Sequence, residues 1–131
     1  MAALVFFQLY IAAQGSGDPL PQESKDTFKA FISLYSDRLK WSDEWAAKAL
    51  EYLKSPNTVK ADMVITGNQS FSQNNTQLLR EKLLKILKPR IDKKGKAIKR
   101  LPAGTVYGCN GVVDKKGNED SISAACLYKK P

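Results

Sequence analysis

The last quarter of the chain has the alternation of apolar and polar positions that is typical of two paired strands. Residues 106–113 and 121–128 flank a polar stretch centred on Gly117-Asn118, a dipeptide that suits the positive φ of a two-residue hairpin turn. A turn there places Cys109 opposite Cys126, Tyr107 opposite Tyr128 and Val113 opposite Ile122. Because opposed residues have the Cβ separation that a disulfide tolerates, the pattern predicts a disulfide-linked β-hairpin.

The same register has two further consequences. It places Lys116 opposite Glu119 and Lys115 opposite Asp120, which predicts cross-strand ion pairs beside the turn. It also gives the hairpin apolar side chains on both faces, whereas a sheet with one solvated face alternates more cleanly. We therefore predict an α/β fold, an α/β/α sandwich with helices on both sides of a mostly antiparallel sheet.

Earlier segments carry the periodicity of helices. Phe28, Phe31, Ile32 and Tyr35 share one helical face, which predicts a helix from about residue 24 to about residue 36, capped by Ser24 or Asp26. A second helix is expected to begin after Ser42, a good N-cap, and to stop at Ser55-Pro56.

The middle of the chain predicts a strand, a loop and a third helix. Apolar residues alternate over 58–66, as expected for a strand, and residues 67–75 are interpreted as a polar loop. The third helix is expected to start at Asn75 or Thr76 and to end at Pro89, because proline is a helix breaker.

The N-terminus indicates export. Residues 1–13 are apolar apart from Gln8, and small residues precede a possible cleavage point, so we predict a signal peptide at residues 1–15 and a single domain at 16–131. No later segment is apolar enough to span a membrane. The two cysteines, and glycosylation sequons at Asn68 and Asn74, fit an oxidising, extracellular location.

Two segments resemble the CAP superfamily of cysteine-rich secretory, antigen 5 and pathogenesis-related proteins (SCP/TAPS). The stretch from Leu39 to Ala49 is similar to the second helix of that family and its approach. The Gly-Cys pair ending at Cys109, with the Cys-x-Tyr run from Cys126, is similar to its closing strands. The resemblance implies an α/β/α sandwich and secretion. It carries no metal site, because the family's cavity histidines have no counterpart here.

Charge and composition narrow the chemistry. The net charge is +8 and the chain has no histidine, which removes the commonest general base and zinc ligand. With both cysteines assigned to a disulfide, we predict no catalytic residue, metal or cofactor, and a binding protein rather than an enzyme.

The segment 88–100 is strongly basic, with Asp92 as its only carboxylate. Its functional interpretation is a surface for a polyanion, such as a sulfated glycan or an anionic lipid surface. The alternative is a solvated loop that only keeps the protein soluble. The candidate polyanion-binding residues are Lys88, Arg90, Lys93, Lys94, Lys96, Lys99 and Arg100.

Three functional hypotheses follow. The first is a secreted binding protein or antigen that acts on an extracellular protein target, with a target in a host organism included. The second is a polyanion-binding protein that uses segment 88–100, with nucleic acid disfavoured because no aromatic residue in the run can stack on bases. The third is a small-lipid carrier with a pocket between helices and sheet. Trp41 and Trp45 are assigned to the core in preference to a ligand groove, and Tyr107 and Tyr128 to a stabilising pair.

Overall fold

The computed structural model describes residues 18–131, and the predicted signal peptide lies outside this part of the chain. A five-stranded sheet is formed by β1 (Asp18–Pro19), β2 (Lys40–Trp41), β3 (Met63–Ser72), β4 (Val106–Lys116) and β5 (Glu119–Lys129). The strand order is β1-β4-β5-β3, and β2 pairs with the same edge of β4 as β1 does. The β2–β4 pair is parallel and the other pairs are antiparallel, so the prediction of a mostly antiparallel sheet is confirmed.

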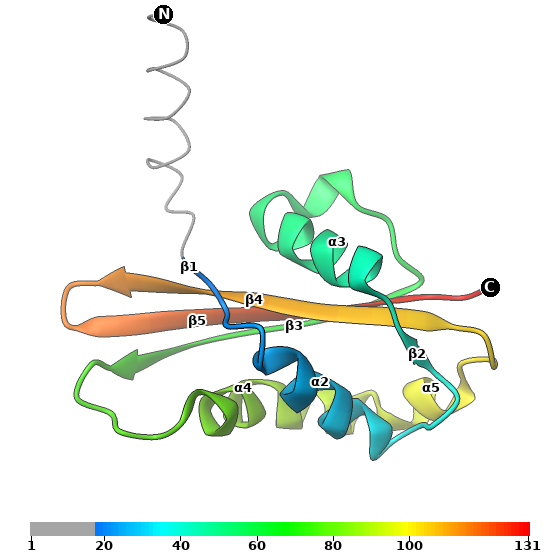
Figure 1. The fold of residues 1–131 in the computed structure, drawn as a ribbon, viewed down its shortest axis with the longest axis horizontal. Coiled ribbons are helices and arrows are strands. Elements are labelled where there is room, and N and C mark those ends of the chain that lie inside the picture. Colours follow the sequence, from blue (N-terminus) through cyan, green and yellow to red (C-terminus); the bar gives the residue numbers. More distant parts are fainter. Residues whose placement is uncertain (1–17) are drawn as a thin grey trace, which may run out of the picture.

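Helices cover both faces of the sheet, which confirms the predicted α/β/α sandwich (Figure 1). Helix α3 (Asp43–Lys54) lies on one face and is followed by the short 3₁₀ helix η1 (Pro56–Thr58). Helices α2 (Ser24–Ser33), α4 (Leu79–Lys93) and α5 (Gly95–Arg100) lie on the other. The apolar core is correspondingly double, with Trp45 and Ala49 packing on Leu127 on the α3 side and the larger cluster on the α2 and α4 side.

The hairpin of β4 and β5 has the predicted register. Cys109 pairs with Cys126, Tyr107 with Tyr128, and the two cysteines form a disulfide. Gly117 occupies the turn with a φ of 60°, the positive value expected at the first central residue of a hairpin turn.

The predicted ion pairs beside the turn were wrong. Lys116 and Lys115 do face Glu119 and Asp120, but the salt bridge observed there joins Lys116 Nζ to Asp114 Oδ2 at 3.6 Å. These two residues are two apart on one strand, so their side chains share a face of the sheet. Lys116 therefore reaches a carboxylate on its own strand.

The strand predicted at 58–66 starts later and runs further, as β3 over Met63–Ser72. Its polar half, interpreted from sequence as a loop, pairs with β5 as far as Ser72 opposite Glu119. Gly67, the first residue of the predicted loop, permits the close approach of α4, since an added Cβ would lie 2.6 Å from Ile86 Cγ2. The exposed Asn and Ser residues of β3 alternate with buried Gly67 and Phe71.

The predicted end of the third helix at Pro89 was also wrong, because α4 continues through Pro89 to Lys93. Leu83, Ile86, Leu87 and Ile91 are buried on both sides of the proline. Ile91 is the one that lies beyond the proline, and its burial contributes about 1.5–3 kcal/mol, comparable to the roughly 3 kcal/mol that an interior proline costs. The helix also begins at Leu79, later than the predicted Asn75 or Thr76.

The first two helices follow the predictions more closely. Helix α2 ends at Ser33, earlier than predicted, and its N-cap Glu23 makes no side-chain capping bond, so neither Ser24 nor Asp26 caps it. Helix α3 has the predicted cap, in which Ser42 Oγ accepts a hydrogen bond from the Trp45 backbone N at 3.1 Å.

Candidate functional site

The seven candidate polyanion-binding residues lie on the end of α4, at Lys94 between the two helices, and on α5, and they are exposed. Ile91, Gly95 and Ile98 between them are buried at helical spacing, so the other positions of the segment face solvent. The segment is therefore helical. The alternative interpretation of this segment as a loop was wrong about its structure. We call this set the basic surface; it comprises Lys88, Arg90, Lys93, Lys94, Lys96, Lys99 and Arg100.

Few contacts within the described chain neutralise the basic surface. Its one carboxylate, Asp92, accepts a hydrogen bond from the Tyr35 hydroxyl and pairs with Lys88 Nζ at 2.7 Å. Arg90 Nη1 donates to the backbone O of Ile86 at 2.8 Å. Among residues 18–131, the other five cations take part in no ion pair.

A further cation adjoins this surface. Arg38 Nη2 donates to the backbone O of Lys99 at 2.8 Å and of Leu101 at 3.1 Å. These carbonyls belong to the C-terminal end of α5, where a cation is favourable. Arg38 is thus fixed beside the basic surface, a position that was not predicted from the sequence.

The two predicted glycosylation residues occupy different settings. Asn68 lies within β3, and its Nδ2 donates to Ser123 Oγ at 2.6 Å and to Ser121 Oγ at 3.2 Å. Asn74 is exposed in the turn after β3. Both assignments stay predictions.

The aromatic residues of the hairpin lie in the core. Tyr107 and Tyr128 are buried and stacked, with ring centroids 5.9 Å apart. Burial raises the pKa of the Tyr107 hydroxyl to about 12. Burial also raises the pKa of Tyr128, and the neighbouring Tyr107 adds to this. The Tyr128 hydroxyl has no hydrogen-bond partner among the described residues.

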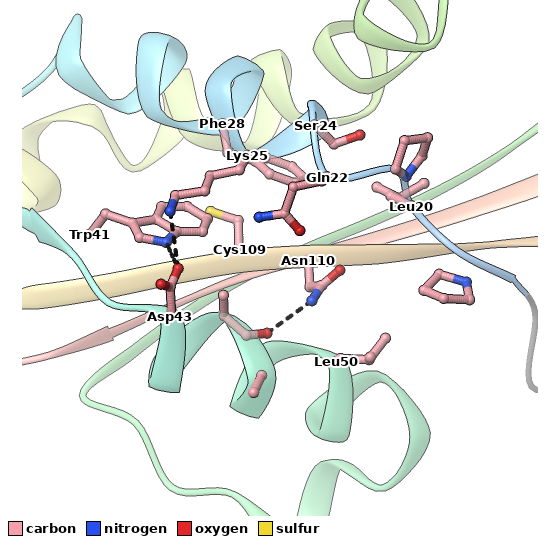
Figure 2. Close-up of a pocket in the computed structure, with 14 residues that line it drawn as sticks. Leu20, Gln22, Ser24, Lys25, Phe28, Trp41, Asp43, Leu50, Cys109 and Asn110 are labelled. Atoms are coloured by element: carbon pink, nitrogen blue, oxygen red, sulfur yellow. Dashed lines mark hydrogen bonds and ion pairs between the residues drawn. The ribbon is translucent and has the colours of Figure 1, made fainter.

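A cleft of about 490 Å³ lies at the edge of the sheet, between the starts of α2 and α3 (Figure 2). We call it the edge cleft. Apolar walls come from Leu20, Phe28, Trp41 and Leu50, and Cys109 and Asn110 of β4 form its floor. Trp41, assigned to the core, is half-buried: it packs against the core cluster and also lines this cleft. Trp45 is buried as predicted.

Hydrogen bonds hold the polar groups of the edge cleft. Asp43 Oδ1 accepts from Trp41 Nε1 at 2.8 Å and from Lys25 Nζ at 3.1 Å. The bond from Trp41, with the bond and charge of Lys25, lowers the pKa of the Asp43 carboxyl. On the floor, Asn110 Nδ2 donates to the backbone O of Ala46 at 3.1 Å. Asp43 and Lys25 are therefore an ion pair whose charges offset each other.

The edge cleft was not predicted, since its lining comes from three separate parts of the chain. Pro19 to Phe28, Trp41 to Leu50, and Cys109 with Asn110 meet only in the folded protein. One sequence signal could have indicated the cleft. Pro19 and Pro21 precede the first helix, and prolines there prevent this segment from pairing with β4 as a long strand.

Residues 18–131 lack two other kinds of site. They contain no group of three or more Cys, Asp or Glu residues placed to hold a metal ion. No helix there is both long and apolar enough to cross a membrane.

The space predicted for a lipid is small in the part of the chain that the structure describes. Between α2, α4 and the sheet the cavity measures about 10 Å³, at most room for about one water molecule and far too little for a lipid. Phe28, Phe31 and Ile32 fill this layer together with the apolar side of α4.

Comparison with known proteins gives the relationship of the chain. A family model described as "15 kDa excretory/secretory protein" matches residues 27–130. The "30 kDa antigenic glycoprotein" of Trichostrongylus colubriformis is 30% identical over 113 residues, which cover 86% of this chain and 84% of that protein. The "15 kDa excretory/secretory protein" of Haemonchus contortus is 31% identical over 104 residues, which cover 74% of this chain and 70% of that protein.

These matches overturn the resemblance to the CAP superfamily, which was wrong. The two segments that carried it meet local requirements that unrelated folds share. Leu39 to Ala49 supplies the N-cap and first turns of α3, and the two Cys-containing segments form a disulfide hairpin.

The prediction of secretion is confirmed by the excretory/secretory family. The family model covers residues 27–130, and the two nematode relatives span most of the chain. The chain belongs to the 15 kDa excretory/secretory protein family.

Proposed function

We propose that this protein is a secreted, non-enzymatic binding protein that attaches to an extracellular polyanion, a sulfated glycan, through its basic surface. The observation that carries the proposal is the arrangement of α4 and α5. Seven cations follow one another along two consecutive helices, face solvent, and share a single carboxylate that is already bonded to Tyr35 and Lys88.

Electrostatics support a polyanion over a single small anion. Exposed charges interact within a Debye length of about 8 Å at physiological salt. Several neighbouring cations therefore each attract nearby sulfates of one polyanion, and their contributions add. Because the side chains of Lys93, Lys94, Lys96 and Lys99 are free of ion pairs within residues 18–131, binding breaks no internal salt bridge of theirs.

The non-enzymatic part of the proposal has its own support. The chain contains no histidine, and both cysteines are joined in the disulfide. Two acidic residues have a lowered pKa: Asp43, held as a carboxylate by Trp41 and Lys25, and Asp62, held by the Lys130 backbone N–H and by Lys129. A carboxylate in that state is a poor proton donor near neutral pH.

Retention on a heparin column across a salt series tests the proposal. The secreted protein is compared with a variant in which Lys93, Lys94, Lys96 and Lys99 are changed to glutamine. A matched control carries the same change in four exposed lysines elsewhere, Lys54, Lys60, Lys115 and Lys130.

The two variants have equal net charge, so they separate a local surface from overall charge. We expect the basic-surface variant to elute at much lower salt than the control. If the two variants eluted at the same salt concentration, retention would depend only on net charge, and the proposed surface would be rejected.

A further inference from the structure

The outer edge of β4 is paired at both ends and open in the middle. At one end β2 pairs with Val106 and Tyr107, and at the other end β1 pairs with Val112 and Val113. Leu20 N, just after β1, still bonds to Gly111 O, so the open stretch is 108–110, about 10 Å of strand. This open stretch is the floor of the edge cleft (Figure 2).

The sequence explains why neither short strand extends over this stretch. β2 ends at Trp41 because Ser42 is the N-cap of α3. β1 ends at Pro19, and the chain then turns at Pro21, whose O accepts from the Ser24 backbone N at 3.0 Å, into α2. The two helices pack on opposite faces of the sheet (Figure 1), so the chain on both sides of the gap leaves the plane of the sheet.

The backbone of Cys109 faces this gap. Tyr107 O accepts from Ser42 N at 2.8 Å, and Gly111 O accepts from Leu20 N at 3.2 Å. Since backbone groups alternate in direction along an antiparallel strand, the N–H and C=O of Cys109, midway between these residues, point the same way.

The disulfide supports this orientation independently. The Cα atoms of Cys109 and Cys126 are 4.1 Å apart, close to the roughly 4.5 Å of a pair that exchanges no hydrogen bonds and unlike the roughly 5.5 Å of a bonded pair. Cys109 is 3% exposed, and its backbone groups have no partner outside the strands within residues 18–131. A buried donor and acceptor are therefore available at the floor of the cleft.

We propose that the edge cleft binds a short extended peptide segment of a partner protein, which adds to β4 as a strand between β1 and β2. The peptide would pair with the N–H and C=O of Cys109, as in recognition by strand addition. Its length would be about three residues, the roughly 10 Å of the open stretch.

The walls suit alternating side chains of such a segment. Successive residues of a strand point to opposite faces. One face meets Leu20 and Phe28, and the other meets Ala46, Ala47 and Leu50. Because Lys25 and Asp43 offset each other, the cleft suits an uncharged apolar segment, in contrast to the basic surface.

The test uses ¹⁵N-labelled protein and two capped tripeptides. The first is acetylated, amidated alanine-leucine-alanine, and the second is the same peptide with every backbone nitrogen methylated, which removes its donors. Titrations follow the chemical shift and the hydrogen exchange of the Cys109 amide. We expect the first peptide to shift this amide and slow its exchange, and methylation to weaken binding by about tenfold, the effect of losing one to two hydrogen bonds.

Two variants in which an alanine is replaced by tryptophan complete the test. Ala47→Trp fills the cleft from an exposed position of α3 and should abolish binding, whereas Ala30→Trp, exposed on α2 outside the cleft, should not. Equal affinity for the two peptides, an unshifted Cys109 amide, or unchanged binding by Ala47→Trp would each overturn the proposal. Heparin retention of Ala47→Trp should equal that of the parent, so this proposal and the proposed function can fail separately.

Discussion

Gly108 of β4 lies directly against the backbone of α3 at Ala46. A Cβ built on Gly108 would overlap the Ala46 backbone N and lie 2.6 Å from its Cα. This close approach brings the first turns of α3 onto the sheet, and it lets Asn110 reach the Ala46 carbonyl at 3.1 Å. The position of one wall of the edge cleft therefore depends on the absence of a side chain at residue 108.

Gly108→Ala should accordingly destabilise the protein. Overpacking of a core costs about 1–3 kcal/mol, and we expect the upper end because backbone atoms, which cannot rotate away, receive the methyl group. Urea unfolding measures the loss. As a control, Gly117→Ala meets no atom within 4 Å and should cost about 1 kcal/mol through its positive φ alone; equal losses would contradict the packing argument.

The hairpin shows what the sequence could predict. Its register follows from local quantities, the turn dipeptide and the spacing of Cys109 and Cys126, and the apolar residues on both faces correctly indicated helices on both sides. Capping of α3 by Ser42 was equally local. Such features need no knowledge of distant parts of the chain.

Other features depend on tertiary contacts that no local pattern reports. Pro89 lies inside α4 because the helix is buried on both sides of it, and the polar half of β3 is a strand because β5 supplies its hydrogen bonds. The edge cleft depends on two chain segments leaving β4 at Pro21 and Ser42. The basic surface was found as a run of residues, but its outward display follows from burial of Ile91 and Ile98.

The disulfide should contribute strongly to stability. Cys109 and Cys126 are 17 residues apart, and closing a loop of this size constrains the unfolded chain by about 3 kcal/mol. A Cys109→Ala, Cys126→Ala double variant should lose about that much in urea unfolding. Reduction of the parent with dithiothreitol should lower stability similarly; an unchanged midpoint would mean that the cross-link adds nothing to the hairpin.

The two sequons should differ in occupancy. Asn74 is exposed in a turn, whereas Asn68 lies in β3 with its Nδ2 bonded to Ser121 and Ser123. A glycan on Asn68 replaces one hydrogen of that Nδ2, so we expect Asn74 to carry more glycan. Intact mass of protein secreted from eukaryotic cells, for Asn68→Gln and Asn74→Gln separately, measures this; a larger mass loss in Asn68→Gln would reverse the ranking.

Tyr128→Phe should leave stability unchanged or raise it by about 1 kcal/mol. The Tyr128 hydroxyl is buried and has no partner within residues 18–131, and a buried unpaired polar group costs about 1–3 kcal/mol. The ring itself, stacked on Tyr107, is kept by phenylalanine. A clear loss of stability in urea unfolding would show that the hydroxyl is hydrogen-bonded in solution.

Alkaline pH should destabilise the protein through Tyr107 and Tyr128. Burial raises the pKa of Tyr107 from 10.0 to about 12, so between these values the unfolded chain releases a proton that the folded chain keeps. Stability then falls as pH rises, because the folded state binds more protons than the unfolded state. Urea unfolding of the parent at pH about 9 and about 11.5 should show this loss. A Tyr107→Phe, Tyr128→Phe variant retains every lysine and should show a smaller loss, and an equal loss in the two proteins would assign the effect to the lysines.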